Sequence, residues 1–168
     1  MSIAFGPQLC GTLEESAQRE WLLADGLGGY AMGTVAGLRT RRYHGLLATD
    51  MMIGLVAVEP VLVIGDSHIR LSTDEWRGGT VDPAGHERLI SFDLTDGVPR
   101  WRWQVGSVVL EREIAMVHGA PVVGIVHTLL AADRPVRLEL TPLCTWRNVH
   151  AERYAFGTPE IENVITST

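Results

Sequence analysis

The sequence contains no lysine, because all 14 of its basic residues are arginine. Acidic residues outnumber them, 20 against 14, and the formal net charge is -6. A nucleic-acid binder usually shows the opposite balance, with clustered cations. No apolar run approaches the roughly 20 residues that a membrane-spanning helix needs. We therefore expect neither a nucleic-acid partner nor a membrane.

Cysteine is also scarce. Cys10 and Cys144 are the only two, and they lie far apart without a CxxC pair, which excludes a disulfide scaffold and a cysteine-based zinc site. The six histidines form no HxH or HExxH pattern, so we predict no metal. The first residues lack the cationic and long apolar segments of a secretory signal. We expect a cytoplasmic protein with reduced thiols.

The composition is otherwise that of an ordinary globular chain. It has 168 residues, of which 46% are hydrophobic and 20% charged, enough for one domain with its own core. Thr12 followed by Glu15 fits a capping box, and predicts a short helix that ends near Arg19. From residue 44 onward, short apolar runs alternate with turns, which is typical of antiparallel strands. The pattern predicts an all-β fold, an antiparallel β-sandwich with a short N-terminal helix.

Three details of this sandwich can be predicted. Residues 121–130 are apolar on both faces, as in a central strand covered on both sides. Residues 73–87 are polar and rich in glycine, and we expect a loop there. Trp101 and Trp103 alternate with polar residues, which favours packing in the core over a sugar-stacking platform with Trp146.

Arg112 shares a strand face with Leu110 and Ile114. A buried charge needs a partner, so we predict that Arg112 forms an internal salt bridge.

Residues 20–47 form the most distinctive segment, EWLLADGLGGYAMGTVAGLRTRRYHGLL. The glycines at 26, 28 and 29 are not followed by Lys-Ser/Thr, so they do not form a phosphate loop. A dinucleotide-binding turn needs a strand before the glycines and a long helix after them. Here we expect a short helix before them and a second glycine-rich stretch after them. We therefore predict no cofactor.

This segment resembles the N-terminal domain of bacterial and archaeal-type glycogen debranching enzymes, the amylo-alpha-1,6-glucosidase family. The family pattern is E-W-L-x-x-N-G-x-G-G-Y-A-x-G-T-V-x-G-x-x-T-R-R-Y-H-G-L-L, and the chain departs from it only at Asp25, where the family more often has Asn. A second block follows Pro142, where the family tends to show Arg-Asp-x-His. Here it reads Arg147-Asn148-Val149-His150, with Asn148 in place of the acid.

The resemblance implies a supersandwich-like domain followed by an α/α barrel. In such enzymes the barrel carries the carboxylate pair that cleaves the α-1,6 branch bond, and 168 residues leave no room for it. We expect residues 1–168 to be a single N-terminal β-sandwich domain, truncated at its C-terminal end, with no catalytic residue of its own. The implied partners are the catalytic barrel and an α-glucan, such as glycogen or a limit dextrin. An edge strand without its neighbour also predicts self-association.

The candidate site residues come from the two matching blocks: Arg41, Arg42, Tyr43, His44, Arg147 and His150. One interpretation is that they contact glucan hydroxyls or the catalytic barrel. The other is that the arginines pair with Asp25 or Glu20 and brace the glycine-rich segment.

Two other functions stay open from the residues alone. A free-standing carbohydrate-binding module would display an exposed, coplanar set of tryptophan rings. A sandwich enzyme acting directly on sugars, such as a mutarotase, would need a histidine and a carboxylate in one open cleft.

Overall fold

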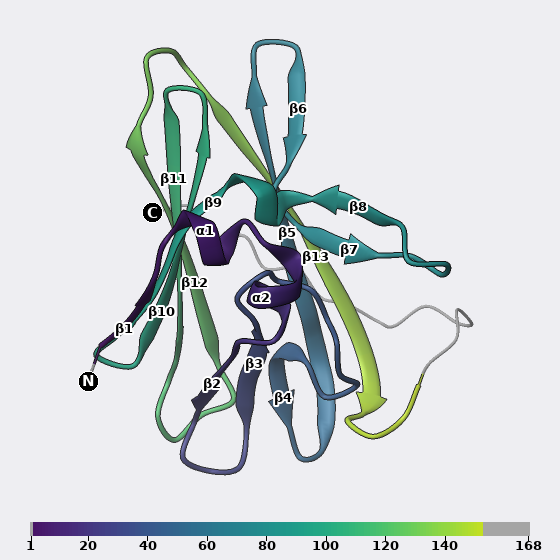
Figure 1. Cartoon of the computed structure of the whole chain (residues 1–168). Helices are drawn as coiled ribbons and strands as arrows, with labels where there is room; N and C mark the ends of the chain where they lie inside the picture. Colours follow the sequence, from purple (N-terminus) through teal and green to yellow (C-terminus); the bar gives the residue numbers. More distant parts are fainter. Residues whose placement is uncertain (1, 153–168) are drawn as a thin grey trace.

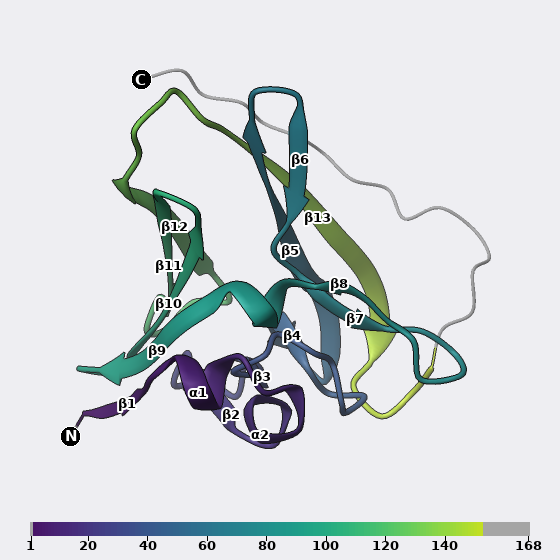
Figure 2. The ribbon, with the colours of Figure 1, turned by 45° about the horizontal axis from the view of Figure 1, so that its top comes forward.

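Two antiparallel β-sheets face each other in the computed structural model, which describes residues 2–152 (Figures 1 and 2). The first sheet has the spatial order β1 (Ile3–Phe5), β9 (Leu89–Thr95), β10 (Val98–Val105), β11 (Val108–Met116) and β12 (Val123–Ala131). The second has the order β13 (Arg137–Asn148), β5 (Met52–Ile64), β4 (Gly45–Thr49), β3 (Tyr30–Thr34) and β2 (Glu20–Ala24), and β6 (Ser67–Arg70) also pairs with β5. The predicted all-β antiparallel sandwich is confirmed.

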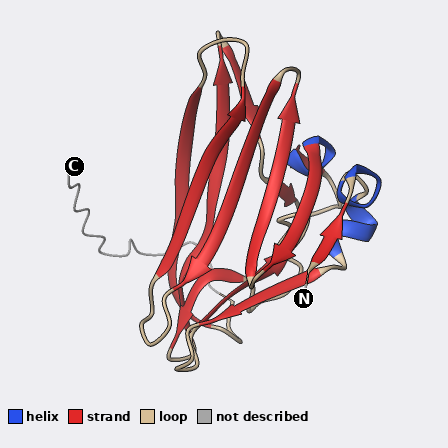
Figure 3. Ribbon diagram, turned by 90° about the vertical axis from the view of Figure 1, so that its left-hand side faces the viewer, coloured by secondary structure: helices blue, strands red, loops and turns tan. Residues whose placement is uncertain are grey.

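Two short α-helices precede the second sheet in the chain, α1 (Pro7–Cys10) and α2 (Leu13–Ala17), and they gather at one side of the strands (Figure 3). The predicted capping box is wrong. Thr12 precedes α2, but its side chain caps no amide of the helix, and its Oγ1 donates instead to the carbonyl of Gln8 at 2.8 Å. No helix within residues 2–152 is long and apolar enough to cross a membrane.

The core between the sheets is built around three tryptophans. Trp101 and Trp103 on β10 are 1% and 5% exposed, as predicted, and Trp21 on β2 reaches them from the opposite sheet. The rings of Trp21 and Trp101 meet edge to face, with centroids 5.2 Å apart. The indole N–H of each ring also has a hydrogen-bond acceptor. The Nε1 of Trp101 donates to Val35 O, and the Nε1 of Trp21 donates to Thr34 O. Such pairs join the sheets by aromatic packing and by directed hydrogen bonds.

Arg112 on β11 lies in this core, and the predicted salt bridge is not formed with any residue of 2–152. It is 9% exposed, and its guanidinium lies over the rings of Trp101 and Trp103, 4.8 and 5.1 Å from their centroids. Its Nη1 donates weakly to Val58 O at 3.4 Å, and its Nε has no partner among the described residues. The aromatic faces take the place of the expected carboxylate. Burial lowers the pKa of Arg112 to about 10.

Several segments adopt strands where none was predicted: β1, β2, β3 and the two strands of the expected loop. The expected helix was to end near Arg19, and residues 20–24 after it form β2, with Trp21 buried and Leu22 exposed in the alternation of a strand. The expected loop at 73–87 contains β7 (Thr73–Glu75), β8 (Val81–Ala84) and the 3-10 helix η1 (Gly85–Arg88). β7 and β8 form an arm that projects from the sandwich (Figure 1). Because water surrounds most of this arm, its sequence lacks the apolar alternation by which strands are recognised.

The prediction of a central strand at 121–130 is also wrong. This segment contains β12, which pairs with β11 alone among the described strands and lies at the edge of its sheet. Val126 and Leu130 on one face are 55% and 48% exposed. β13, the next strand in the chain, is the edge of the other sheet. An apolar run predicts burial, but it does not predict which element provides that burial.

Candidate functional site

Asp25 organises the turn between β2 and β3. Its carboxylate is 2% exposed, and its Oδ1 accepts hydrogen bonds from the backbone amides of Leu27 (2.7 Å) and Gly29 (2.9 Å). A Cβ at Gly29 would lie 2.2 Å from Asp25 Oδ2, so only glycine fits there. Within the described residues no arginine pairs with Asp25. A local side chain-to-backbone turn therefore holds this loop. Of the two expected arginine partners, Asp25 or Glu20, it is Glu20 that pairs with Arg41.

Glu20, Arg41 and His44 form a compact cluster, which joins the start of β2 to the segment before β4. The Nε2 of His44 lies 3.1 Å from Glu20 Oε1, and the Nε of Arg41 donates to the same oxygen. Because an ionised carboxylate can only accept, Glu20 fixes the Nε2–H tautomer of His44. His44 is 1% exposed, and its Nδ1 has no partner in the described part of the chain.

The protonation of His44 is set mainly by its surroundings. Burial lowers the pKa of His44, and the hydrogen bond to Glu20 only partly offsets this effect. The ring is therefore neutral near pH 7 and closed off from bulk water. Its contact with Glu20 links β2 to the segment that carries Arg41 and Arg42.

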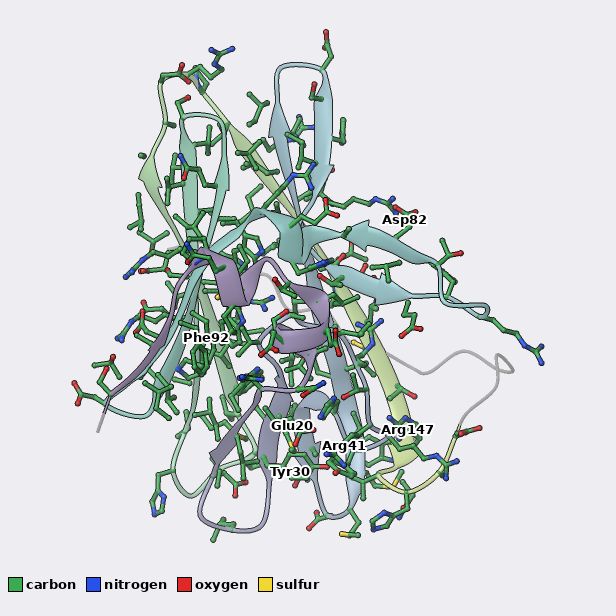
Figure 4. The ribbon with its side chains drawn as sticks, in the orientation of Figure 1. Glu20, Tyr30, Arg41, Asp82, Phe92 and Arg147 are labelled. Carbon is green, nitrogen blue, oxygen red and sulfur yellow. The ribbon has the colours of Figure 1, made fainter. Side chains whose placement is uncertain are left out.

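Arg147 joins the two sequence blocks. From β13 its Nη2 donates to the backbone carbonyl of Arg42, and its Nη1 donates to Asn148 O (3.2 Å) and Ala151 O (3.0 Å). Tyr30 reaches the same loop, since its hydroxyl donates to Tyr43 O at 3.0 Å. Figure 4 shows Glu20, Tyr30, Arg41 and Arg147 grouped at one end of the second sheet.

Asn148 and His150 belong to the turn that follows β13. The Oδ1 of Asn148 accepts the backbone amide of His150 at 2.9 Å, a role that an amide oxygen fills as well as a carboxylate oxygen. Nearby, Nη2 of Arg42 lies 2.9 Å from Glu152 Oε1. The substitution of Asn for the family's usual Asp therefore keeps the turn.

The six candidate residues thus lie in one region, and they differ in accessibility. The side chains of Arg41 and Arg42 are 53% and 61% exposed, and His150 is exposed as well. Tyr43 and Arg147 are half-buried, and His44 is enclosed. We call these six residues the arginine surface. It presents guanidinium groups to solvent beside hydrogen bonds that are part-buried or exposed.

The sequence analysis missed Trp76 in the expected loop. This tryptophan lies on the tip of the β7–β8 arm, 62% exposed, beside a cavity lined by several charged residues. The sequence feature that could have identified it is a single aromatic residue among polar residues and glycines in residues 74–80. Within residues 2–152 no group of three or more His, Cys, Asp or Glu is placed to hold a metal ion.

The comparisons with known proteins agree with the two sequence blocks. Residues 19–165 match the family model described as glycogen debranching enzyme N terminal. No curated protein and no solved structure matches the chain significantly. The matched region includes β2 through β13 and therefore all six residues of the arginine surface. On this match, which covers most of the chain, the protein belongs to the glycogen debranching enzyme N-terminal family.

Proposed function

We propose that this chain is the accessory N-terminal domain of a glycogen-debranching glycoside hydrolase, which cleaves the α-1,6 branch points of glycogen. Its role is to shape or brace the catalytic domain, and the exposed arginines contact that domain or the glucan. The observation that carries the proposal is the contact of Arg147 with the Arg42 carbonyl, which holds the two blocks typical of the family as one surface.

The arginine surface divides into supporting and presenting groups. His44, Tyr43 and Arg147 make their contacts to the protein itself. Arg41 and Arg42 each use a carboxylate partner, Glu20 and Glu152, yet keep more than half of the side chain exposed. A guanidinium carries five N–H donors, so each retains donors for a carboxylate or a sugar hydroxyl.

The test is made in the intact enzyme, with Arg42→Ala and His44→Ala assayed on a limit dextrin across pH. Both substitutions should weaken activity while the pH profile keeps its two limbs, because neither residue carries the proton in the reaction. Loss of one limb in His44→Ala would make His44 a proton carrier and contradict the proposal. Unchanged activity with a lowered melting temperature would show that these residues only stabilise the fold.

The chain itself should be non-catalytic. Glycoside hydrolysis needs two carboxyl groups held across the scissile bond, and the proposal assigns that pair to the catalytic barrel. The purified 168-residue chain should release no glucose from a limit dextrin beyond a heat-treated control. We also propose a cytoplasmic location, which the two free thiols, Cys10 and Cys144, favour.

The two alternatives find less support. Trp101 and Trp103 are buried, so they form no sugar platform for a free-standing binding module. His44 and Glu20 do converge, as a mutarotase-like enzyme would require. However, His44 is 1% exposed and lines a cavity of only about 60 Å³, well below the roughly 300–1,000 Å³ of small-molecule sites.

A further inference from the structure

A second candidate site lies away from the arginine surface, under the β7–β8 arm. A cavity of about 330 Å³ is lined there by residues from the arm, from β5 and β6, and from the 35–44 segment: Arg39, Glu59, Arg70, Asp74 and Trp76 among them. This volume is at the low end of the roughly 300–1,000 Å³ of small-molecule sites. We propose that this cavity binds one or two pyranose rings of an oligosaccharide, with the indole of Trp76 as the stacking platform.

Trp76 is exposed but held in place. Its Nε1 donates to the carbonyl of Asp82 at 2.6 Å across the arm, and its backbone amide donates to Thr80 O at 2.8 Å. With the polar edge of the indole satisfied, the apolar ring face stays uncovered at 62% exposure. A fixed, exposed aromatic ring is a typical binding feature, since little conformational entropy is lost when a ligand packs on it. The C–H face of a pyranose ring is such a ligand.

The wall of the cavity provides hydrogen-bonding groups in fixed positions. Arg39 donates through Nη2 to Asp74, and its Nη1 lies 3.9 Å from Glu59 Oε1. Glu59 and Asp74 are mostly buried, with side chains 25% and 14% exposed, so the protein rather than water orients them. Paired carboxylate and guanidinium groups offer acceptors and donors side by side, which is what the neighbouring hydroxyls of a sugar require.

The charges also argue for a neutral ligand. Arg70 pairs with Asp82, Nη2 to Oδ1 at 2.6 Å, while Arg39 pairs with Asp74. Of the residues that line the cavity, the three carboxylates of Glu59, Asp74 and Glu75 outnumber the two arginines, and this excess disfavours a phosphate or another anion. The two guanidinium groups already pair with carboxylates of this region, which disfavours a cationic ligand. A polyhydroxylated, uncharged molecule with one apolar face fits the remaining chemistry.

The choice of an α-glucan as this sugar rests on the proposed function, whereas the site itself rests on the cavity. The experiment uses the 168-residue chain and titrates it with maltoheptaose by calorimetry and by tryptophan fluorescence. Trp76→Ala should weaken binding about tenfold or more, and Trp76→Phe, which keeps a ring, should weaken it less. Arg70→Ala should weaken it also. Trp146→Ala is the matched control, because Trp146 is 56% exposed on β13, and it should bind like the wild type.

Equal binding by Trp76→Ala and the wild type would overturn the proposal, and so would an absence of binding by the wild-type chain. Cellohexaose, bound as tightly as maltoheptaose, would overturn the assignment to an α-glucan. Unfolding curves of each variant verify that the fold is kept. These outcomes are independent of Arg42→Ala activity in the intact enzyme, so failure here is distinguishable from failure of the proposed function.

Discussion

Arg147 donates a hydrogen bond to the backbone carbonyl of Arg42, a residue 105 positions earlier in the chain. This contact and those to Asn148 O and Ala151 O make one guanidinium the common support of both sequence blocks. The exposed Arg42 therefore depends on a side chain from the opposite end of the described chain.

Arg147→Ala should lower the free energy of unfolding by about 1–2 kcal/mol, since hydrogen bonds from a charged donor to backbone carbonyls are lost. It should also speed amide exchange in residues 41–44. Urea unfolding and hydrogen exchange measure these effects. Arg137→Ala is the control, because Arg137 is 66% exposed and pairs with Glu139 on its own strand. Unchanged exchange in residues 41–44 would show that the loop does not need Arg147.

Asp25 offers a test of the glycine-rich turn. Asp25→Ala removes the acceptor for two buried amides and should cost about 1–3 kcal/mol. Asp25→Asn keeps an oxygen at Oδ1, and should cost much less. Denaturant unfolding of both variants distinguishes the loss of the acceptor from the loss of the charge. Equal destabilisation by Ala and Asn would mean that the charge, not the acceptor, holds the turn.

Arg112 should be replaceable by an apolar residue of similar length. Arg112→Met removes a buried cation that has no carboxylate partner, so stability should be unchanged or higher, by up to about 4 kcal/mol. Arg112→Ala should instead destabilise by roughly 2–5 kcal/mol, because a cavity opens between Trp101 and Trp103. Thermal unfolding compares the two. A Met variant as unstable as the Ala variant would show that the cation contributes more than its bulk.

Two buried histidines, His44 and His86, and the half-buried His127 predict a loss of stability in acid. Burial lowers the pKa values of His44 and His86, and burial with the nearby charge of Arg112 lowers the pKa of His127 to about 4. The unfolded chain then binds protons more readily than the folded one. Their contribution is fully present above pH 6.5 and is lost as pH falls toward about 4.

The free energy of unfolding, measured by urea titration at several pH values, checks this window. His127→Gln should flatten the decline between pH 6.5 and 4. A wild-type chain equally stable at pH 7 and pH 4.5 would contradict the prediction.

The open edges of the sandwich predict self-association. Within residues 2–152, β12 and β13 are edge strands of their sheets, and edge strands offer backbone groups to other chains. Val126, Leu130 and Leu140 add apolar side chains that are 47–55% exposed. Light scattering should show a mass above that of the monomer at high concentration, and Val126→Lys should reduce it. Leu27→Lys, in an exposed turn, is the control. A clean monomer at high concentration would refute association through these edges.

The sequence predicts those parts of the fold in which the surroundings of a residue follow from the local strand alternation. Trp101 and Trp103 could be placed in the core, because strand alternation alone puts them on the inner face. The environment of Arg112 could not be predicted in this way, since two tryptophans on a neighbouring strand take the place of the expected acidic side chain. Residues 121–130 show the same limit, because their apolar character is compatible with a buried centre or an uncovered edge.

The arginine surface was predictable as a set of residues and not as an arrangement. The resemblance selected Arg41 to His44 and Arg147 to His150, but nothing in either block indicates that His44 is enclosed while Arg42 is exposed. Trp76 was missed because a polar arm carries no periodic pattern, and its cavity depends on Arg39, Glu59 and Arg70 from three separate parts of the chain.

The pairing of β13 with β5 has a consequence for how the chain acquires its surface. Arg147 is placed opposite Ile53 by this pairing, so the loop at Arg42 gains its support only after segments from distant parts of the chain have met. Folds dominated by such long-range pairing form slowly, in milliseconds to seconds. The arginine surface should therefore appear in the last stage of folding, and incompletely folded chains would not present it to a catalytic domain or to a glucan.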